Sequence, residues 1–177
     1  MNWNDYEVFD PGVDRPLNEL PRAVATMAYL ELMAVKNHRV DQLRRLAAAN
    51  GIDIDAESGL RDLNRWFDKS VSPSASNPQR LESRWYSVVN DIALLLGDQI
   101  VERSGQTLRW QLCKGERKNV SYQRPVIVGF EVKNANYNLD LDLLVGMYGH
   151  RLLQGQPANP DYFESLVTSA IARAPGR

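Results

Sequence analysis

The clearest hydrophobic pattern in the chain lies between residues 81 and 103. Apolar side chains recur there at steps of three and four residues, which is the spacing of an amphipathic helix. They are Leu81, Trp85, Val88, Val89, Ile92, Leu95, Leu96 and Ile100. The apolar face is wide, so this helix is expected to pack on more than one side. The pattern stops at Gly105, and Leu108, Trp110 and Leu112 then alternate as in a half-buried strand. The sequence thus predicts a long central helix that leads directly into a strand.

Helical spacing is also present on the N-terminal side of this helix. An apolar stripe follows Pro21 and predicts a helix that runs to about Asn37. The stripe consists of Ala23, Val24, Met27, Leu30 and Ala34. The spacing resumes over residues 40–50, and Gly51 suits the position that follows a helix end. Whether residues 21–50 form one helix or two stays open. Basic side chains near this end suit the helix dipole and are expected on a solvated face. They are Arg39, Arg44 and Arg45.

Shorter helices are predicted in the rest of the chain. Residues 60–67 form a short amphipathic pattern, and residues 139–154 and 160–171 return to helical spacing. Together with the helices above, this gives about six helices.

The segment from residue 107 to residue 132 has the alternating pattern of strands. Residues 107–114 are predicted as a first strand and residues 125–132 as a second, and residues 120–122 can form a short third. The pairing is expected to be antiparallel, with helices covering one face of the sheet. We expect one core to contain Trp85, Ile92, Leu96, Trp110 and Val128.

These elements define the fold class as α+β, mainly helical, with a long central helix packed on a small two- or three-stranded antiparallel sheet. Residues 1–177 are expected to form a single globular domain. Within it, residues 1–19 form an extended arm, residues 20–69 a helical half and residues 70–79 a loop rich in serine and proline. Residues 80–177 form the central helix, the small sheet and the C-terminal helices.

Two features bear on how the chain assembles. Trp3, Tyr6, Val8 and Phe9 can anchor the arm to the body of the protein, and docking of the arm on a partner is the alternative. Leu94 lies on an otherwise polar side of the central helix, which raises the hypothesis of a helix-mediated dimer. The oligomeric state stays open.

The composition narrows the class of protein. The chain is 44% hydrophobic and 24% charged with a formal net charge of −1, so nothing draws it as a whole towards nucleic acid or an anionic membrane. One cysteine excludes an internal disulfide and fits a reducing compartment. The first residues do not resemble a secretory signal, and no apolar run is long enough for a membrane span. We therefore expect a cytoplasmic protein with no membrane partner.

No recognised catalytic motif is present in the sequence. Phosphate-binding glycine motifs and the nucleophile elbow are missing, and neither His38 nor His150 has a second ligand at metal-binding spacing. Lys114 and Arg117 lie near Cys113 and favour a reactive thiol, but no histidine is close in sequence. We therefore predict no catalytic residue, no cofactor and no metal ligand.

Two neighbouring carboxylates begin the predicted helix over residues 139–154. Side chains at i and i+2 on a helix do not face each other, so Asp140 and Asp142 are not predicted to act as an acid–base pair. Asp140 is instead expected to cap the helix N-terminus.

The most uneven charge lies between the two predicted strands. Its basic and aromatic side chains are the candidate partner-binding residues Arg109, Lys114, Arg117, Lys118, Tyr122 and Arg124. Glu116 is the single acid among them. Three interpretations are open: a solvated hairpin whose charges prevent edge-to-edge pairing, a surface for an acidic protein partner, or an RNA surface. The net charge of −1 disfavours nucleic acid.

The pattern G-x-x-x-R-W, formed by Gly105, Arg109 and Trp110, together with the order of the elements, resembles small bacterial α+β proteins. Some of these are immunity proteins that bind and block a toxin. The resemblance implies a non-catalytic cytoplasmic interaction protein that inhibits an acidic partner such as a toxin. A small hydrolase or transferase without a recognised motif is the alternative, and an RNA-binding accessory protein is a third hypothesis.

Overall fold

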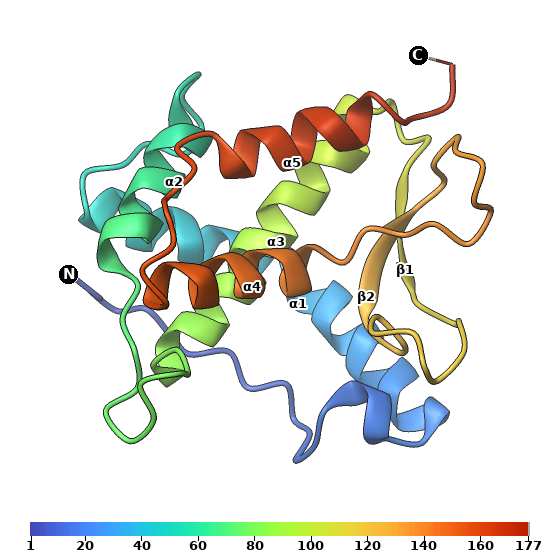
Figure 1. The fold of residues 1–177 in the computed structure, drawn as a ribbon, viewed down its shortest axis with the longest axis horizontal. Helices are drawn as coiled ribbons and strands as arrows, with labels where there is room; N and C mark the ends of the chain where they lie inside the picture. Colours follow the sequence, from blue (N-terminus) through green and yellow to red (C-terminus); the bar gives the residue numbers. More distant parts are fainter. Residues whose placement is uncertain (177) are drawn as a thin grey trace.

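The computed structural model describes residues 1–176. In this part of the chain it contains five α-helices, a short 3-10 helix and a two-stranded antiparallel sheet (Figure 1). In chain order the elements are η1 (Leu17–Glu19), α1 (Arg22–Ala49), α2 (Gly59–Ser70), α3 (Ser83–Arg103), β1 (Arg109–Leu112), β2 (Pro125–Val128), α4 (Leu141–Leu153) and α5 (Tyr162–Ile171). The predicted α+β, mainly helical class is confirmed.

Helix α3 lies at the centre of the fold, as its wide apolar pattern predicts. Helices α1, α4 and α5 and strand β1 pack against it, while α2 packs on α4 and α5 (Figure 1). The buried side chains of α3 include Leu94, which is 2% exposed. The hypothesis of a dimer through Leu94 is therefore wrong, because the side of α3 that looked polar in sequence is covered by the rest of the fold.

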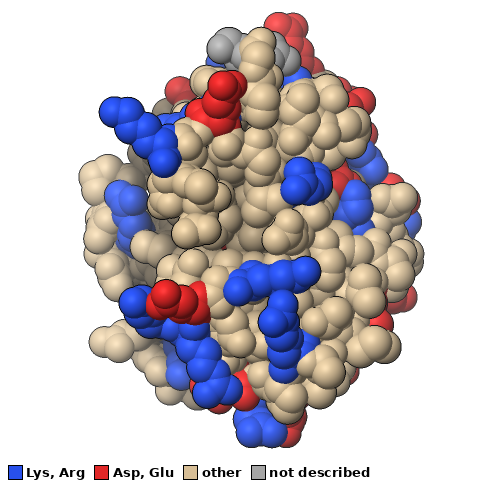
Figure 2. All heavy atoms as spheres, turned by 90° about the vertical axis from the view of Figure 1, so that its right-hand side faces the viewer, with Lys and Arg blue, Asp and Glu red and all other residues tan. Residues whose placement is uncertain are grey.

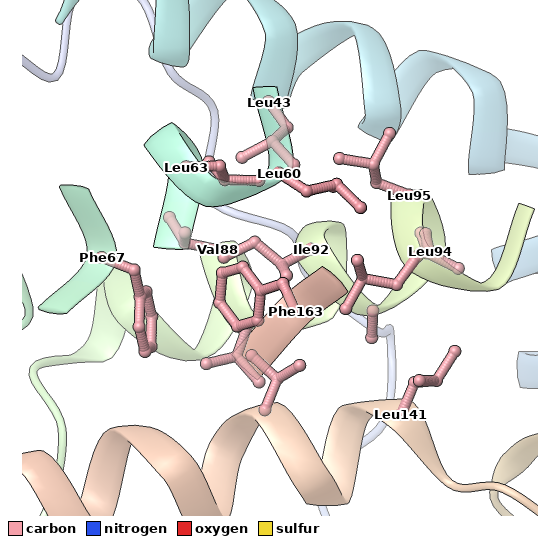
Figure 3. Close-up of a cluster of buried hydrophobic side chains, with 14 of the residues drawn as sticks. Leu43, Leu60, Leu63, Phe67, Val88, Ile92, Leu94, Leu95, Leu141 and Phe163 are labelled. Atoms are coloured by element: carbon pink, nitrogen blue, oxygen red, sulfur yellow. The ribbon is translucent and has the colours of Figure 1, made fainter. Parts of the chain in front are cut away.

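The core is formed by α3 together with the other four α-helices. Figure 3 shows Leu43 of α1, Leu63 of α2 and Phe163 of α5 around Ile92, with Leu141 of α4 on the side of Leu94. Each of these side chains is fully buried. Removing one such aliphatic side chain typically costs about 2–5 kcal/mol, so this cluster is the main source of stability.

The expected core set is confirmed for the helical residues and wrong for one strand residue. Trp85, Ile92 and Leu96 are at most 1% exposed, and Trp110 packs against the cluster as a partly buried side chain. Val128 is half-buried and lies outside the cluster, whereas its neighbour Ile127 is fully buried. Both Val126 and Ile127 of β2 are fully buried, so burial in this strand does not follow the simple alternation that the sequence predicted.

Helix α1 is one continuous helix of 28 residues, so the chain does not break between residues 37 and 39. The apolar stripe predicted to face the core instead faces outward: Met27 is 57% exposed and Leu30 is 54% exposed. The buried positions in this half of the helix are Ala25 and Leu32. Residues 23–35 are apolar on nearly every side, so spacing alone does not select the buried face.

The sheet is an antiparallel ribbon in which Arg109 pairs with Val128 and Trp110 pairs with Ile127. Its strands are shorter than predicted, and residues 120–122 lie in turns, so no third strand forms in the described chain. Gly129 ends β2 because its φ of +105° lies outside the strand region, and a Cβ there would lie 2.6 Å from the Thr107 carbonyl oxygen.

The N-terminal arm is held by a buried ion pair between α1 and α3. The Arg39 guanidinium donates from Nε to Asp91 Oδ1 at 2.9 Å and from Nη2 to Asp91 Oδ2 at 2.6 Å. From the arm, the Tyr6 hydroxyl donates to Asp91 and the Phe9 backbone N–H donates to Ser87. Arg39 is 4% exposed, so its predicted place on a solvated face is wrong. Its partner Asp91 is distant in sequence and meets it only in the folded chain.

Among residues 1–176, no helix combines the length and the apolar character that crossing a bilayer requires.

Candidate interaction site

The outward face of the ribbon forms the floor of a broad basin of about 1110 Å³. Arg109 and Gln111 of β1 and Val126 and Val128 of β2 contribute to this floor. The alternation of strand side chains explains the arrangement, because Trp110 lies on the opposite face, towards α3. The floor is thus set by strand register and is rigidly attached to the core.

Two loops form the walls of the basin. One wall is the segment after β1, with Lys114, Glu116 and Lys118 at the basin, and the other wall is the segment 129–138 after β2. The backbone turns at Asn119, whose N–H donates to the Glu116 carbonyl at 2.8 Å. Loops mounted on a rigid ribbon are a common way to present binding residues.

The basin carries a local excess of positive charge. Arg109, Lys114 and Arg117 are exposed, and their side chains make no hydrogen bond or ion pair within residues 1–176. Lys118 pairs with the one acid of this loop, Glu116, at 2.9 Å, and both are largely exposed. Figure 2 shows this side of the molecule, where Lys and Arg side chains are more prominent than Asp and Glu. Two cations without a partner, Arg109 and Lys114, therefore line one open hollow, and a third, Arg117, lies on the adjoining exposed loop.

The second wall supplies amide and aromatic groups that the sequence did not identify as part of a site. Asn136 and Asn138 line the basin together with Phe130 and Tyr137. The two rings contact each other edge to face, with centroids 5.0 Å apart. The signal available in the sequence was the run NANYN over residues 134–138, which is typical of a turn. The segment 134–138 comes close to β1 only because of the path that the chain takes after Gly129.

Arg124 does not belong to the basin, which corrects its prediction as a partner-binding residue. Its Nε donates to Asp140 at 2.7 Å and its Nη2 donates to Asp142 at 2.6 Å. Burial opposes the charged form of Arg124, but the Asp142 and Asp140 carboxylates outweigh burial and raise its pKa. Arg124 is already neutralised inside the protein, so it is not available to an acidic partner.

The two carboxylates around Arg124 are positioned by the start of α4. Asp140 is the N-cap of the helix, as predicted, and accepts a hydrogen bond from the Leu143 N–H at 2.9 Å. Asp142 follows in the first turn. The two side chains meet at one guanidinium group, so the arrangement is an ion-pair cluster and not an acid–base pair.

Tyr122 also lies outside the basin. It is half-buried, and its backbone N–H donates to the Asn119 carbonyl at 2.9 Å within the turn that precedes β2. Of the six predicted residues, the structure brings Arg109, Lys114 and Lys118 to the basin and places Arg117 on the same exposed loop.

Cys113 lies at the edge of the basin and is 5% exposed. The only hydrogen bond of its thiol within the described chain comes from Asn138 Nδ2, at 3.9 Å. Neither histidine lines the basin: His38 Nε2 is 4.0 Å from Glu7, and His150 Nδ1 is 3.2 Å from the Gln79 carbonyl. Across residues 1–176, no group of three His, Cys, Asp or Glu side chains is arranged to hold a metal ion.

Comparison of the chain with known protein families, with curated proteins and with solved structures found no match.

Proposed function

We propose that this protein is a non-catalytic interaction protein, and that the basin on its ribbon receives an acidic surface of a partner protein. The observation that supports the proposal is that two unpaired cations, Arg109 and Lys114, line one hollow beside the exposed loop that carries Arg117. A cation without an internal partner keeps its full capacity for a carboxylate from outside. Arg109 is the strongest contributor, because its guanidinium can bind a carboxylate through two parallel hydrogen bonds.

The charge of the basin is a local property of the molecule. The chain as a whole has a net charge of −1, so the positive field is confined to this face. Such a field orients an acidic partner during approach and mainly raises the association rate. The half-buried Val128 and Phe130 then offer apolar contact area at the centre of the docked surface.

A protein partner fits the basin better than a nucleic acid does. Phe130 and Tyr137 pack against each other, which occupies ring surface that base stacking would need. The basin cations Arg109, Lys114 and Lys118 surround one hollow, whereas single-stranded nucleic acid is usually bound along an extended basic groove. RNA binding is kept as an outcome of the test described at the end of the Discussion.

The resemblance to immunity proteins suggests a more specific proposal. The protein would then act in the cytoplasm and inhibit an acidic toxin by occupying its surface. The alternative, a small hydrolase or transferase, stays a hypothesis. Two features would favour it: a pocket that holds two facing carboxylates, or Cys113 beside a histidine. The Cys113 thiol receives its hydrogen bond from Asn138.

The proposal is tested by charge reversal in the basin. The partner is first captured from the native host and purified, and its association rate is then measured against Arg109→Glu/Lys114→Glu. We expect the rate to fall by roughly 10-fold or more at low salt, and its salt dependence to weaken.

The matched control carries the same charge change far from the basin. Arg45 and Arg80 are exposed and make no ion pair within residues 1–176, so Arg45→Glu/Arg80→Glu has an identical net charge. The control should keep most of the association rate. An equal loss in both double variants would mean that net charge, and not the basin, governs binding.

A further inference from the structure

A second hollow lies on the inner side of the ribbon, beneath the N-terminal arm. It has a volume of about 120 Å³. The arm, α1, α3 and the ribbon each contribute apolar side chains to its wall. They are Phe9, Pro11, Leu17, Ala28, Tyr29, Leu32, Ala93, Leu94, Trp110 and Pro125.

This hollow is a recess that is partly open to solvent and not an enclosed void. Concave recesses lined mainly by apolar side chains are where small molecules usually bind. An apolar cavity of about 150 Å³ is known to accept benzene. The hollow beneath the arm is close to that size, so a six-membered ring fits it in volume.

Polar groups are few, and they lie together around the apolar wall. Asn90, Arg124 and Asp142 complete the lining. Asp142 uses Oδ2 to accept from Arg124, whereas its Oδ1 makes no hydrogen bond within the described residues. The Tyr29 hydroxyl and Asn90 Oδ1 are also without a hydrogen-bond partner there. An apolar hollow with a few unused polar atoms is the usual form of a small-molecule site.

The charges at this end of the cavity select the ligand. Arg124 carries one positive charge and faces the two carboxylates Asp140 and Asp142. Burial raises the pKa of Asp142, whereas the Arg124 guanidinium favours its ionised form. Asp140 is also satisfied by the Leu143 N–H at the start of α4, so Asp142 retains the unused acceptor. The cluster has a net charge of −1 and attracts a cation more than an anion.

We propose that this cavity binds a small amine, with an apolar body about the size of a benzene ring and a protonated amino group directed at Asp142. The ammonium group donates to the free Asp142 oxygen and restores neutrality to the cluster. The ring fills the space between Leu32, Leu94 and Trp110. The site is separate from the basin, which lies on the opposite face of the ribbon.

The arm acts as the cover of this site. Phe9 and Pro11 line the cavity, and the Phe9 N–H donates to Ser87 Oγ at 2.7 Å. Pro11 is exposed and Phe9 is half-buried, so these two arm residues of the lining also contact solvent. A bound ligand therefore touches the arm and adds contacts that hold it in place.

The proposal is tested with three probes that share one ring: benzylamine, benzyl alcohol and benzoate. Binding is followed by amide and tryptophan indole shifts in NMR spectra of the full chain. Benzylamine is expected to bind best, with a Kd on the order of 1 mM for so small a ligand, and benzoate worst. The Trp110 indole signal should shift, because this side chain lines the cavity.

Two variants distinguish binding of the probes in the cavity from binding at the protein surface. Ala28→Leu places a larger side chain into the hollow and should abolish binding of all three probes while the protein stays folded. Asp142→Asn should reduce benzylamine binding to the level of benzyl alcohol. Glu57→Gln removes one exposed charge elsewhere and should change nothing.

A saturable benzylamine shift that Ala28→Leu removes and Asp142→Asn weakens supports the proposal. No saturable shift up to about 20 mM of any probe overturns it, since even weak fragments bind a suitable site at that level. Binding that persists in Ala28→Leu, or a preference for benzoate, also overturns it.

Discussion

At the scale of single residues, one glycine determines how the ribbon meets the central helix. Gly97 faces the Trp110 ring, and a Cβ at this position would lie 2.6 Å from its Cη2 atom. The close approach lets the Trp110 indole N–H donate to Asp98 at 3.0 Å. Asp98 also receives Lys36, so one carboxylate joins α1, α3 and β1.

Gly97→Ala should therefore destabilise the protein, although alanine favours a helix more than glycine does. The Trp110 ring has to move, and overpacking of this kind costs about 1–3 kcal/mol. Urea unfolding measures the change. Gly146→Ala in α4 is the matched control, because its nearest atom would be 3.7 Å away, and it should stabilise by about 0.5–1 kcal/mol. Equal effects of the two changes would contradict the close approach at Gly97.

Tyr148 gives a prediction for alkaline pH. Burial, and then the Asp68 carboxylate that accepts its hydroxyl at 2.6 Å, raise the pKa of Tyr148 from 10.0 to about 12. A raised pKa means that folding favours the protonated phenol. Its contribution to stability is complete below pH 10.0 and is lost as the pH rises through about 12.

Tyr148→Phe removes this titration. The variant should be less stable at neutral pH by about 1 kcal/mol or more, because Asp68 loses its donor. Its free energy of unfolding should also decline less steeply than that of the wild type between pH 10.0 and about 12. Parallel pH profiles for the two proteins would show that Tyr148 does not titrate in this range.

At the scale of elements, the buried pair of Arg39 and Asp91 fastens the arm to two helices. Breaking such a pair leaves an uncompensated buried charge, so Asp91→Ala should cost about 3–5 kcal/mol. Replacing both partners, as in Arg39→Met/Asp91→Leu, should cost much less, because no lone charge remains. Denaturant unfolding compares the two. A double variant as unstable as the single one would mean that the hydrogen bonds to the arm, and not the charge balance, dominate.

The elements also show what sequence can predict. The central helix and both strands follow from periodicity, because the buried face of α3 and the alternation at Leu108 and Trp110 are local patterns. The buried face of α1 does not, since Met27 and Leu30 are as apolar as Leu32. Arg39 was misplaced for a related reason: its partner lies on another helix, and pairing between distant positions leaves no local pattern.

The candidate site could likewise be predicted only in part from the sequence. The cations of the first loop were predicted from their one-sided charge. The opposite wall, with Asn138 and Tyr137, was not, because it reaches the basin only after the chain turns at Gly129. Arg124 has the same charge as its neighbours in sequence, and only the fold shows that Asp140 and Asp142 neutralise it.

At the scale of the whole molecule, the ribbon separates two hollows of opposite character. The outer basin is wide and cationic, whereas the inner cavity is small, apolar and bounded by an acidic cluster. The N-terminus lies on the side of the molecule away from the ribbon (Figure 1). An N-terminal attachment therefore leaves the basin open for binding measurements.

We propose that the outer basin binds acidic protein surfaces. The most direct test is an NMR titration of the full chain with a short peptide of aspartate and glutamate, beside a single-stranded RNA oligonucleotide. The account predicts that the peptide shifts amides in residues 109–119 and 126–138, and that Arg109→Glu/Lys114→Glu removes these shifts while Arg45→Glu/Arg80→Glu retains them. Shifts located elsewhere, shifts that survive the charge reversal in the basin, or tighter binding of the RNA would contradict it.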